Sequence, residues 1–234
     1  MSSVYRSKMR HVTRTALGIV FSLTALVTTQ TTTADALTWG AARQSTSFLS
    51  YSLAVGRVGA TASWNRSSRI ARSELSSLKR CMGNPASCSS RGLRIWAETV
   101  NQLASIPAAR RLAAVNSAIN KVGRYRSDAA VYGVPDYWAS PVEFFTNGGD
   151  CEDFALAKYW TLKALGARSE DMRVVVVKIR SSSEGHALLQ VGRSNGAHLM
   201  DNRTNAVSRA AVDRRYAPIY AVSNAGSWLY VAAN

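Results

Sequence analysis

The sequence is poor in the residues from which metal and redox centres are usually built, with three cysteines and three histidines among 234 residues. No two cysteines have C-x-x-C spacing, and no histidine lies near Cys81 or Cys88, which argues against a structural zinc site. Acidic residues are also few, 14 against 29 lysines and arginines, and the net charge is +15. The arginines form no single basic tract and no DNA- or RNA-binding motif accompanies them, so we expect no nucleic acid partner.

The sequence also lacks an apolar run of the roughly 20 residues that a membrane-spanning helix needs. Its apolar segment at residues 16–27 follows four basic residues and precedes a polar segment that ends Ala34-Asp35-Ala36. This order predicts a signal peptide over residues 1–36, cleaved after Ala36, and hence a periplasmic or secreted protein. An uncleaved membrane anchor is the alternative. Cleavage would leave 198 residues, with 25 basic against 13 acidic residues and a net charge of +12, which is enough chain for one domain.

The three cysteines divide into a pair and a single residue. Cys81 and Cys88 flank the turn-forming dipeptide Asn84-Pro85, and an exported protein meets an oxidising compartment, so we predict a local disulfide. A metal site at these two cysteines is the competing interpretation. Cys151 would then be the odd cysteine, which in an exported protein indicates a reactive thiol.

The periodicity of apolar residues changes from helical to extended along the chain. Residues 37–66 are rich in Ser, Thr, Ala and Gly, and we expect an irregular N-terminal arm there. Helical spacing predicts helices over residues 68–80, 92–104, 107–122 and 151–165. Short apolar or alternating runs predict strands over residues 172–180, 187–191, 197–200, 219–222 and 228–232. Helices followed by strands predict an α+β fold in which an N-terminal helical layer packs on an antiparallel β-sheet.

Cys151 follows a Gly-rich turn at the predicted start of a helix. A helix N-terminus lowers the pKa of a thiol, and its free N–H groups can bind an oxyanion. Asp150 fits the N-cap position, with Glu152 and Asp153 in the first turn. These three carboxylates would raise the thiol pKa, because like charges disfavour ionisation, so a histidine cation or a metal cation must offset them. A buried structural cysteine is the alternative.

His186 is the best candidate for a base beside this thiol. It follows Gly185 at the start of a predicted strand, and Asp201 ends the next strand, where its carboxylate could orient the imidazole. Asn202 could orient it instead. His198 lies three residues from Asp201, an odd offset that places the two on opposite faces of a strand.

Ser194 lies in a second motif, the G-x-S-x-G pattern at residues 192–196. In serine hydrolases this pattern joins a strand to a helix. Here Asn-Gly stands between two predicted strands, which indicates a hairpin turn rather than a nucleophile.

Three segments, Gly149–Ala155, Gly185–Leu189 and Leu199–Asn202, resemble the bacterial transglutaminase-like cysteine proteinase family and occur in the order found there. The resemblance covers roughly residues 137 to 230. It implies a papain-like or transglutaminase-like domain, here residues 67–234, with Cys151 as nucleophile, His186 as base and Asp201 as the orienting acid.

The resemblance also implies calcium binding by acidic residues that flank the cysteine, here Asp150, Glu152 and Asp153. Oxygen ligands suit calcium, although helix capping alone would also explain these residues. In this family the substrate includes a large surface adhesin that is cut to release cells from a biofilm, under a membrane receptor that senses a cyclic dinucleotide. We expect a monomer.

The leading expectation is therefore an exported cysteine endopeptidase with a Cys151–His186–Asp201 triad. An acyltransferase or amidase acting on protein or cell-wall amides is an alternative, because the same thioester would form. A non-catalytic basic module that binds acidic surface polymer is the alternative from another class.

Overall fold

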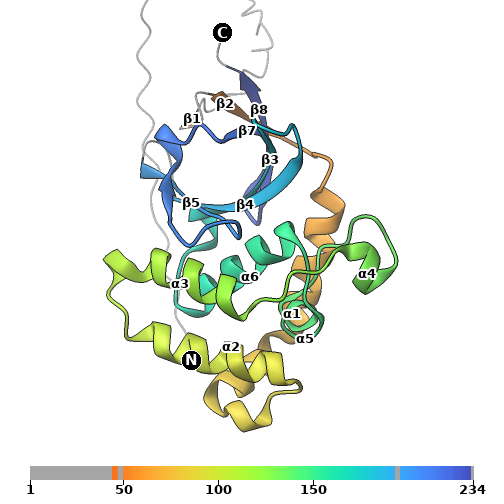
Figure 1. Cartoon of the computed structure of the whole chain (residues 1–234), viewed down its shortest axis with the longest axis vertical. Helices are drawn as coiled ribbons and strands as arrows, with labels where there is room; N and C mark the ends of the chain where they lie inside the picture. The colour runs from red at the N-terminus through yellow and green to blue at the C-terminus, as the bar shows by residue number, and fades with distance from the viewer. Residues whose placement is uncertain (1–43, 47–49, 193–195, 233–234) are drawn as a thin grey trace, which may run out of the picture. The chain divides into compact units, whose positions relative to one another are not determined.

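The computed structural model describes residues 44–46, 50–192 and 196–232. The predicted signal peptide and Ser194 lie outside the described residues. These described residues form one compact unit, in which helices pack on one side of a curled sheet (Figure 1). No helix in the described part of the chain is long and apolar enough to cross a bilayer.

The helical layer contains the predicted helices, the first of them longer than expected. The α-helices are α1 (Thr61–Gly83), α2 (Arg91–Ala104), α3 (Ala108–Val122), α4 (Asp128–Tyr132), α5 (Pro141–Asn147) and α6 (Cys151–Ala164). Short 3-10 turns cover Pro85–Ser87, Ser169–Asp171 and Ala210–Val212. Side chains cap three of the helices: Ser90 accepts a hydrogen bond from the Leu93 N–H at the start of α2, and capping boxes join Ser140 with Glu143 in α5 and Asp150 with Asp153 in α6.

The sheet has eight strands in the order β1-β2-β8-β7-β3-β4-β5-β6, and every neighbouring pair is antiparallel. The strands are β1 (Gln44–Thr46), β2 (Ser50–Val55), β3 (Met172–Ile179), β4 (Gly185–Val191), β5 (His198–Met200), β6 (Ser208–Arg209), β7 (Tyr216–Ser223) and β8 (Gly226–Ala232). The predicted α+β class with an antiparallel sheet is therefore confirmed. β4 and β5 pair antiparallel, and residues 193–195 between them lie outside the described residues.

The expected irregular arm at residues 37–66 is wrong for its described part. β2 pairs with β8 along its whole length, and α1 begins at Thr61. The edge of a sheet provides backbone hydrogen-bond partners for a strand of almost any composition, so a Ser- and Ala-rich segment can pair there.

The sheet has two buried faces. In β3, Met172 and Val174 face the cluster shared with the helices, whereas Val175, Val177 and Ile179 face a second cluster between the strands. A strand that is buried on both faces has a continuous apolar sequence, which explains its run of four valines.

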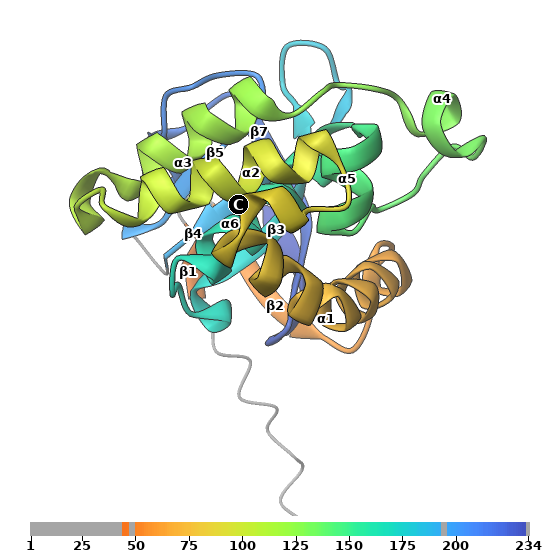
Figure 2. The ribbon, with the colours of Figure 1, turned by 90° about the horizontal axis from the view of Figure 1, so that it is seen from below.

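Helix α6 lies at the centre of the unit, between the other helices and the sheet. Every residue from Glu152 to Leu162 is buried, and α6 contacts α3, α5, β3 and β4. Figure 1 shows α2 on the side of α6 away from the strands, and Figure 2, seen from below, shows α2 and α3 next to each other, in agreement with their contacts. The indole N–H of Trp96 in α2 donates to the Thr161 hydroxyl at 2.9 Å, which ties the layers together. The fold thus holds α6, the helix that begins at Cys151, between the other helices and the sheet.

The predicted disulfide joins Cys81, at the end of α1, to Cys88 just beyond the first 3-10 turn. Cys151 is the free cysteine.

Candidate active site

The turn that delivers Cys151 to the start of α6 requires its two glycines. Gly148 has a φ of +88°, a backbone conformation that residues other than glycine rarely adopt. A Cβ on Gly149 would lie 2.0 Å from Asp153 Oδ2, the atom that accepts the Asp150 N–H at 3.2 Å. The Gly-Gly pair therefore brings the backbone onto the Asp153 carboxylate, which holds the first turn of the helix in place.

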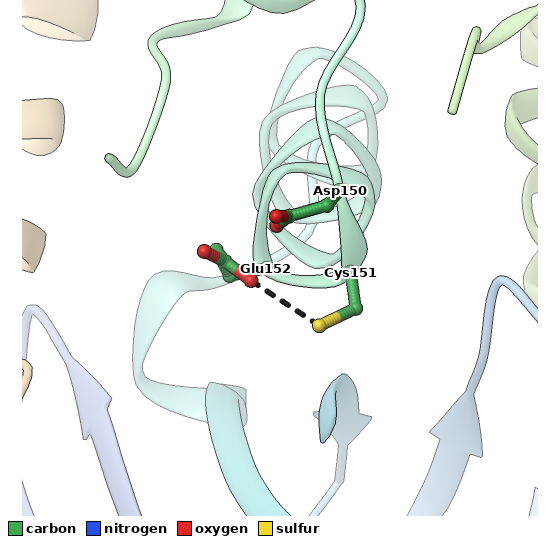
Figure 3. Close-up of side chains that lie close together, drawn as sticks. All are labelled: Asp150, Cys151 and Glu152. Atoms are coloured by element: carbon green, nitrogen blue, oxygen red, sulfur yellow. Dashed lines mark hydrogen bonds between the residues drawn. The ribbon is translucent and has the colours of Figure 1, made fainter. Parts of the chain in front are cut away.

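The thiol of Cys151 is partly exposed and donates a hydrogen bond to Glu152 Oε2 at 3.2 Å (Figure 3). Burial raises the pKa of the thiol well above its ordinary value, and the charge and hydrogen bond of Glu152 raise it further. A backbone hydrogen bond from Ala187 acts in the opposite direction. In this arrangement the thiol is protonated, so its activation depends on removing the influence of Glu152 or supplying a base.

His186 and Asp201 form a buried pair at the adjacent end of the sheet. His186 Nε2 lies 2.9 Å from Asp201 Oδ1, and the two side chains are 6% and 1% exposed. Although burial raises the pKa of Asp201, hydrogen bonds from His186 and Tyr216 lower it to about 2. The carboxylate is therefore ionised and can fix the imidazole tautomer. Asp201, rather than Asn202, is the partner of His186.

The start of β4 brings this pair to the thiol. The backbone N–H that reaches Cys151 belongs to Ala187, the residue after His186. Because Nε2 of His186 faces Asp201, Nδ1 is the ring nitrogen that does not face the carboxylate. His198 pairs with Val191 at the opposite end of β4, which agrees with its exclusion.

Two side chains of this site were missed in the sequence. The hydroxyl of Tyr216, at the start of β7, donates to Asp201 Oδ2, and its ring centroid lies 5.8 Å from that of His186. Burial raises the pKa of Tyr216, so it remains a neutral donor. Arg215 Nη1 lies 3.9 Å from Asp201 Oδ2. Only the pairing of β7 with β3 brings these residues beside Asp201, and no sequence motif marks that pairing.

A cluster of carboxylates lies around Asp150 and Glu152, the residues on either side of Cys151. Ligand atoms of Asp150, Cys151 and Glu152 lie within 4.8 Å of one another. The same holds for Asp128, Asp136 and Glu152, and for Asp128, Asp150 and Asp153. We call Asp128, Asp136, Asp150 and Glu152 the acidic cluster. Asp128 and Asp136 were missed in the sequence, because they lie more than ten residues before the cysteine and only the fold brings them near it.

The acidic cluster has the properties of a cation site. Burial, reinforced by neighbouring carboxylates, raises the pKa of Asp128 to about 7 and that of Glu152 to about 10. The buried Oδ1 atoms of Asp128 and Asp150 have no hydrogen-bond partner in the described part of the chain. Unpartnered carboxylate oxygens that repel one another are suited to a hard cation such as calcium, so the donor set fits that ion.

Asp153, the third predicted metal ligand, has a different environment. Its Oδ1 accepts the Ala139 N–H at 2.7 Å and its Oδ2 accepts the Asp150 N–H. Burial raises its pKa to about 8. Through these two hydrogen bonds from backbone N–H groups, Asp153 holds the start of α6 in place.

Lys158 leads to a prediction about stability. It lies seven residues after Cys151 in α6, so it faces the same side two turns along, and its buried Nζ has no hydrogen-bond partner among the described residues. Burial lowers its pKa to about 7, while Asp201 acts to raise it. The unfolded chain therefore binds a proton that the folded chain lacks between about pH 7 and pH 10, and stability rises with pH across that window.

Replacing Lys158 with methionine should increase the free energy of unfolding by about 1–4 kcal/mol at pH 6, because an uncompensated buried charge is removed. The gain should shrink towards pH 10, because the cost of burying the lysine falls as the pH approaches its ordinary pKa of 10.5. Urea unfolding of wild type, Lys158→Met and the exposed control Lys121→Met at both pH values measures this. A less stable Lys158→Met protein at pH 6 would show that attraction to Asp201 outweighs the cost of burial.

Comparison with known proteins gives one family and a set of related structures. The sequence model of "bacterial transglutaminase-like cysteine proteinase BTLCP" matches residues 69–234. Among solved structures, calcium-bound LapG from Legionella pneumophila is 28% identical, with a TM-score of 0.56 over 65% of this chain and 87% of that one. An EGTA-treated form of the same protein matches with the same identity and TM-score over 84% of its length. No curated protein matches.

Proposed function

Because the chain belongs to the bacterial transglutaminase-like cysteine proteinase family and is a cysteine peptidase, we propose that it is an endopeptidase with Cys151 as nucleophile, His186 as base and Asp201 as orienting acid. The observation that carries this proposal is the buried 2.9 Å bond between His186 Nε2 and Asp201 Oδ1. A bond in this position leaves Nδ1 of the imidazole directed to other partners. The residue after His186, Ala187, forms a backbone hydrogen bond with the free Cys151.

In the proposed reaction, Nδ1 of His186 takes the thiol proton and the Cys151 sulfur attacks the carbonyl carbon of the peptide bond. The oxyanion is stabilised by N–H groups in the first turn of α6, which have no acceptor within the helix. The C–N bond then breaks and the imidazolium returns its proton to the leaving amine. Water, deprotonated by the same imidazole, hydrolyses the thioester and restores the thiol.

The carboxylates beside the thiol oppose this chemistry unless they are neutralised. We propose that Asp128, Asp136, Asp150 and Glu152 hold a calcium ion, which when bound supplies positive charge next to the thiol. The unpartnered oxygens of Asp128 and Asp150, and the calcium-bound state of LapG from L. pneumophila, support this assignment. With its carboxylate engaged elsewhere, Glu152 no longer accepts the thiol proton, which lowers the barrier to transfer towards His186.

The substrate is proposed to be a protein outside the cytoplasm, of the surface-adhesin type, with a membrane receptor as regulator. Two features support this proposal: the signal-peptide pattern of residues 1–36 and the motif resemblance around Cys151.

Endopeptidase activity can be separated from acyl transfer in one reaction. Denatured protein substrate, calcium and a fluorescent primary amine are incubated with the enzyme, and products are analysed by mass spectrometry. We expect internal peptide bonds to be cut, with new amino and carboxyl termini. Incorporation of the amine into glutamine side chains without new termini would contradict the proposal and favour a transferase. Neither product, with retention on an anionic polymer, would favour a binding module.

A further inference from the structure

A pocket lined by arginines lies beside the His186–Asp201 pair. It has a volume of about 370 Å³, and its lining includes Arg180, Arg203, Arg214, Arg215 and Tyr216. We call it the arginine pocket. Nothing in the proposed reaction uses the first three of these side chains.

Three separate segments build the arginine pocket. Ile179, the last residue of β3, pairs with Tyr216 at the start of β7, and the Arg180 N–H donates to the Arg215 carbonyl at 2.9 Å. Arg203 comes from the turn that follows Asp201, where its own N–H donates to Asp201 Oδ1 at 3.0 Å. The arginines therefore converge through the same pairing of strands that places Tyr216 against Asp201.

The arginine pocket carries an excess of positive charge. Arg215 is neutralised by Asp213, with Nη2 to Oδ2 at 2.6 Å and Nε to Oδ1 at 3.1 Å. Arg180, Arg203 and Arg214 are exposed and form no ion pair within the residues that the structure describes. Three guanidinium groups are thus available to a ligand, and the planar guanidinium binds carboxylates through paired hydrogen bonds.

The arginine pocket begins one side chain away from the proposed base. Tyr216 lines it and also lies against the His186 ring at 5.8 Å between centroids. An extended peptide advances about 3.3 Å per residue, so side chains roughly two to four residues from the cleaved bond can reach the arginines.

We propose that the arginine pocket binds acidic side chains of the protein substrate and so selects cleavage sites with Asp or Glu a few residues from the cut bond. The inference rests on the proposed endopeptidase function for its role, although the binding itself does not need catalysis. An acidic peptide fits this position better than a free anion, because the pocket is open and adjoins the residues that would act on a peptide chain.

Binding is tested with the Cys151→Ala protein, so that catalysis plays no part. The probe is a fluorescein-labelled eight-residue peptide of alternating glutamate and serine, compared with the same peptide carrying glutamine in place of glutamate. Fluorescence anisotropy at low and moderate salt gives the dissociation constants. The pocket variant adds Arg180→Gln and Arg214→Gln, whereas the control variant adds Arg94→Gln and Arg110→Gln on the helical layer, which lowers the net charge equally.

We expect the glutamate peptide to bind more tightly than the glutamine peptide. The dissociation constant of the glutamate peptide should rise about tenfold in the pocket variant. The control variant should change it less than twofold, and added salt should weaken the specific binding. Equal losses in both variants would overturn the inference, because general charge would then explain binding. So would pocket-dependent binding of inorganic polyphosphate without preference for the glutamate peptide, which would favour an anionic polymer.

Cleavage gives an independent measurement. Active enzyme is given a mixture of denatured peptides, and the sequences around the cut bonds are read by mass spectrometry. Asp and Glu should be enriched two to four residues from the cut in wild type and in the control variant, and this enrichment should be lost in the pocket variant. Cleavage without enrichment overturns the inference and leaves the endopeptidase intact, whereas glutamate-peptide binding without any cleavage overturns the endopeptidase alone.

Discussion

Cys151→Ala protein is expected to retain its fold and to lose peptide cleavage by a factor of about 10⁴ or more. Removal of the nucleophile from an enzyme of this kind abolishes the covalent route, and only a small residual rate from binding remains. The substitution removes one atom from a partly exposed side chain and one weak hydrogen bond, to Glu152, so little stability is at stake. Cleavage of denatured protein, with circular dichroism to verify the fold, measures the effect.

The rate at which an electrophile labels the Cys151 thiol tests whether His186 acts as its base. Of the three cysteines, Cys81 and Cys88 are joined in a disulfide, so a thiol-directed electrophile such as iodoacetamide labels Cys151 alone. His186→Ala should slow this labelling and cleavage strongly, because the imidazole that accepts the proton is gone. His198→Ala is the matched control, since His198 lies in β5, paired with Val191 at the far end of β4 from His186. Equal rates in the two histidine variants, or cleavage retained in Cys151→Ala, would contradict the assignment.

The same Cys151→Ala substitution can identify the substrate in cells. A surface protein that is normally cut should accumulate at its full length when only the Cys151→Ala form is present. The acidic-residue content around the missing cut can then be compared with the preference expected of the arginine pocket. If every surface protein keeps its wild-type length and amount, the proposed location and substrate type fail while the in-vitro activity stands.

Spacing along the chain favoured His186 over His198 as the histidine beside Asp201, and the structure pairs His186 with Asp201. Alternation along strands fixes which side chains share a face, so an odd offset from Asp201 excluded one histidine. It could not decide between Asp201 and Asn202, because neighbours at the end of a strand differ only in the detail of the turn that follows. The 2.9 Å bond to His186 resolved that choice.

Contacts between distant segments could not be predicted in the same way. Asp128, at the start of α4, and Asp136, in the loop that follows α4, lie near Glu152 only through tertiary packing, and a single sequence contains no signal for that packing. Tyr216 reaches Asp201 through the pairing of β3 with β7, two strands separated by β4, β5 and β6 in the chain. Local pattern therefore predicted the free cysteine at the helix start, whereas the charged groups around it and around His186 depend on tertiary structure.

Calcium removal is expected to have the second large effect, and Asp128→Asn should reproduce it. Asp128 contributes a buried carboxylate oxygen without a partner, and the hydrogen bond from the Tyr137 N–H to its other oxygen, at 2.6 Å, can also be accepted by an amide. The variant therefore keeps the loop in place and loses one negative charge from the acidic cluster. A chelator should abolish cleavage by wild type, calcium should restore it, and the Asp128→Asn protein should respond to neither over the same range of concentration.

Thermal unfolding provides a readout that does not depend on activity. Calcium at one hundred times its dissociation constant should stabilise wild type by about 2.7 kcal/mol, because it binds the folded state alone. Asp128→Asn should lose most of this gain, and Glu98→Gln, which removes an exposed acid from α2, should keep it. If all three proteins respond alike, or none responds, the carboxylates serve only to shape the turn and to cap α6. The protonated thiol would then have to be activated by His186 alone, against the field of Glu152 and Asp150.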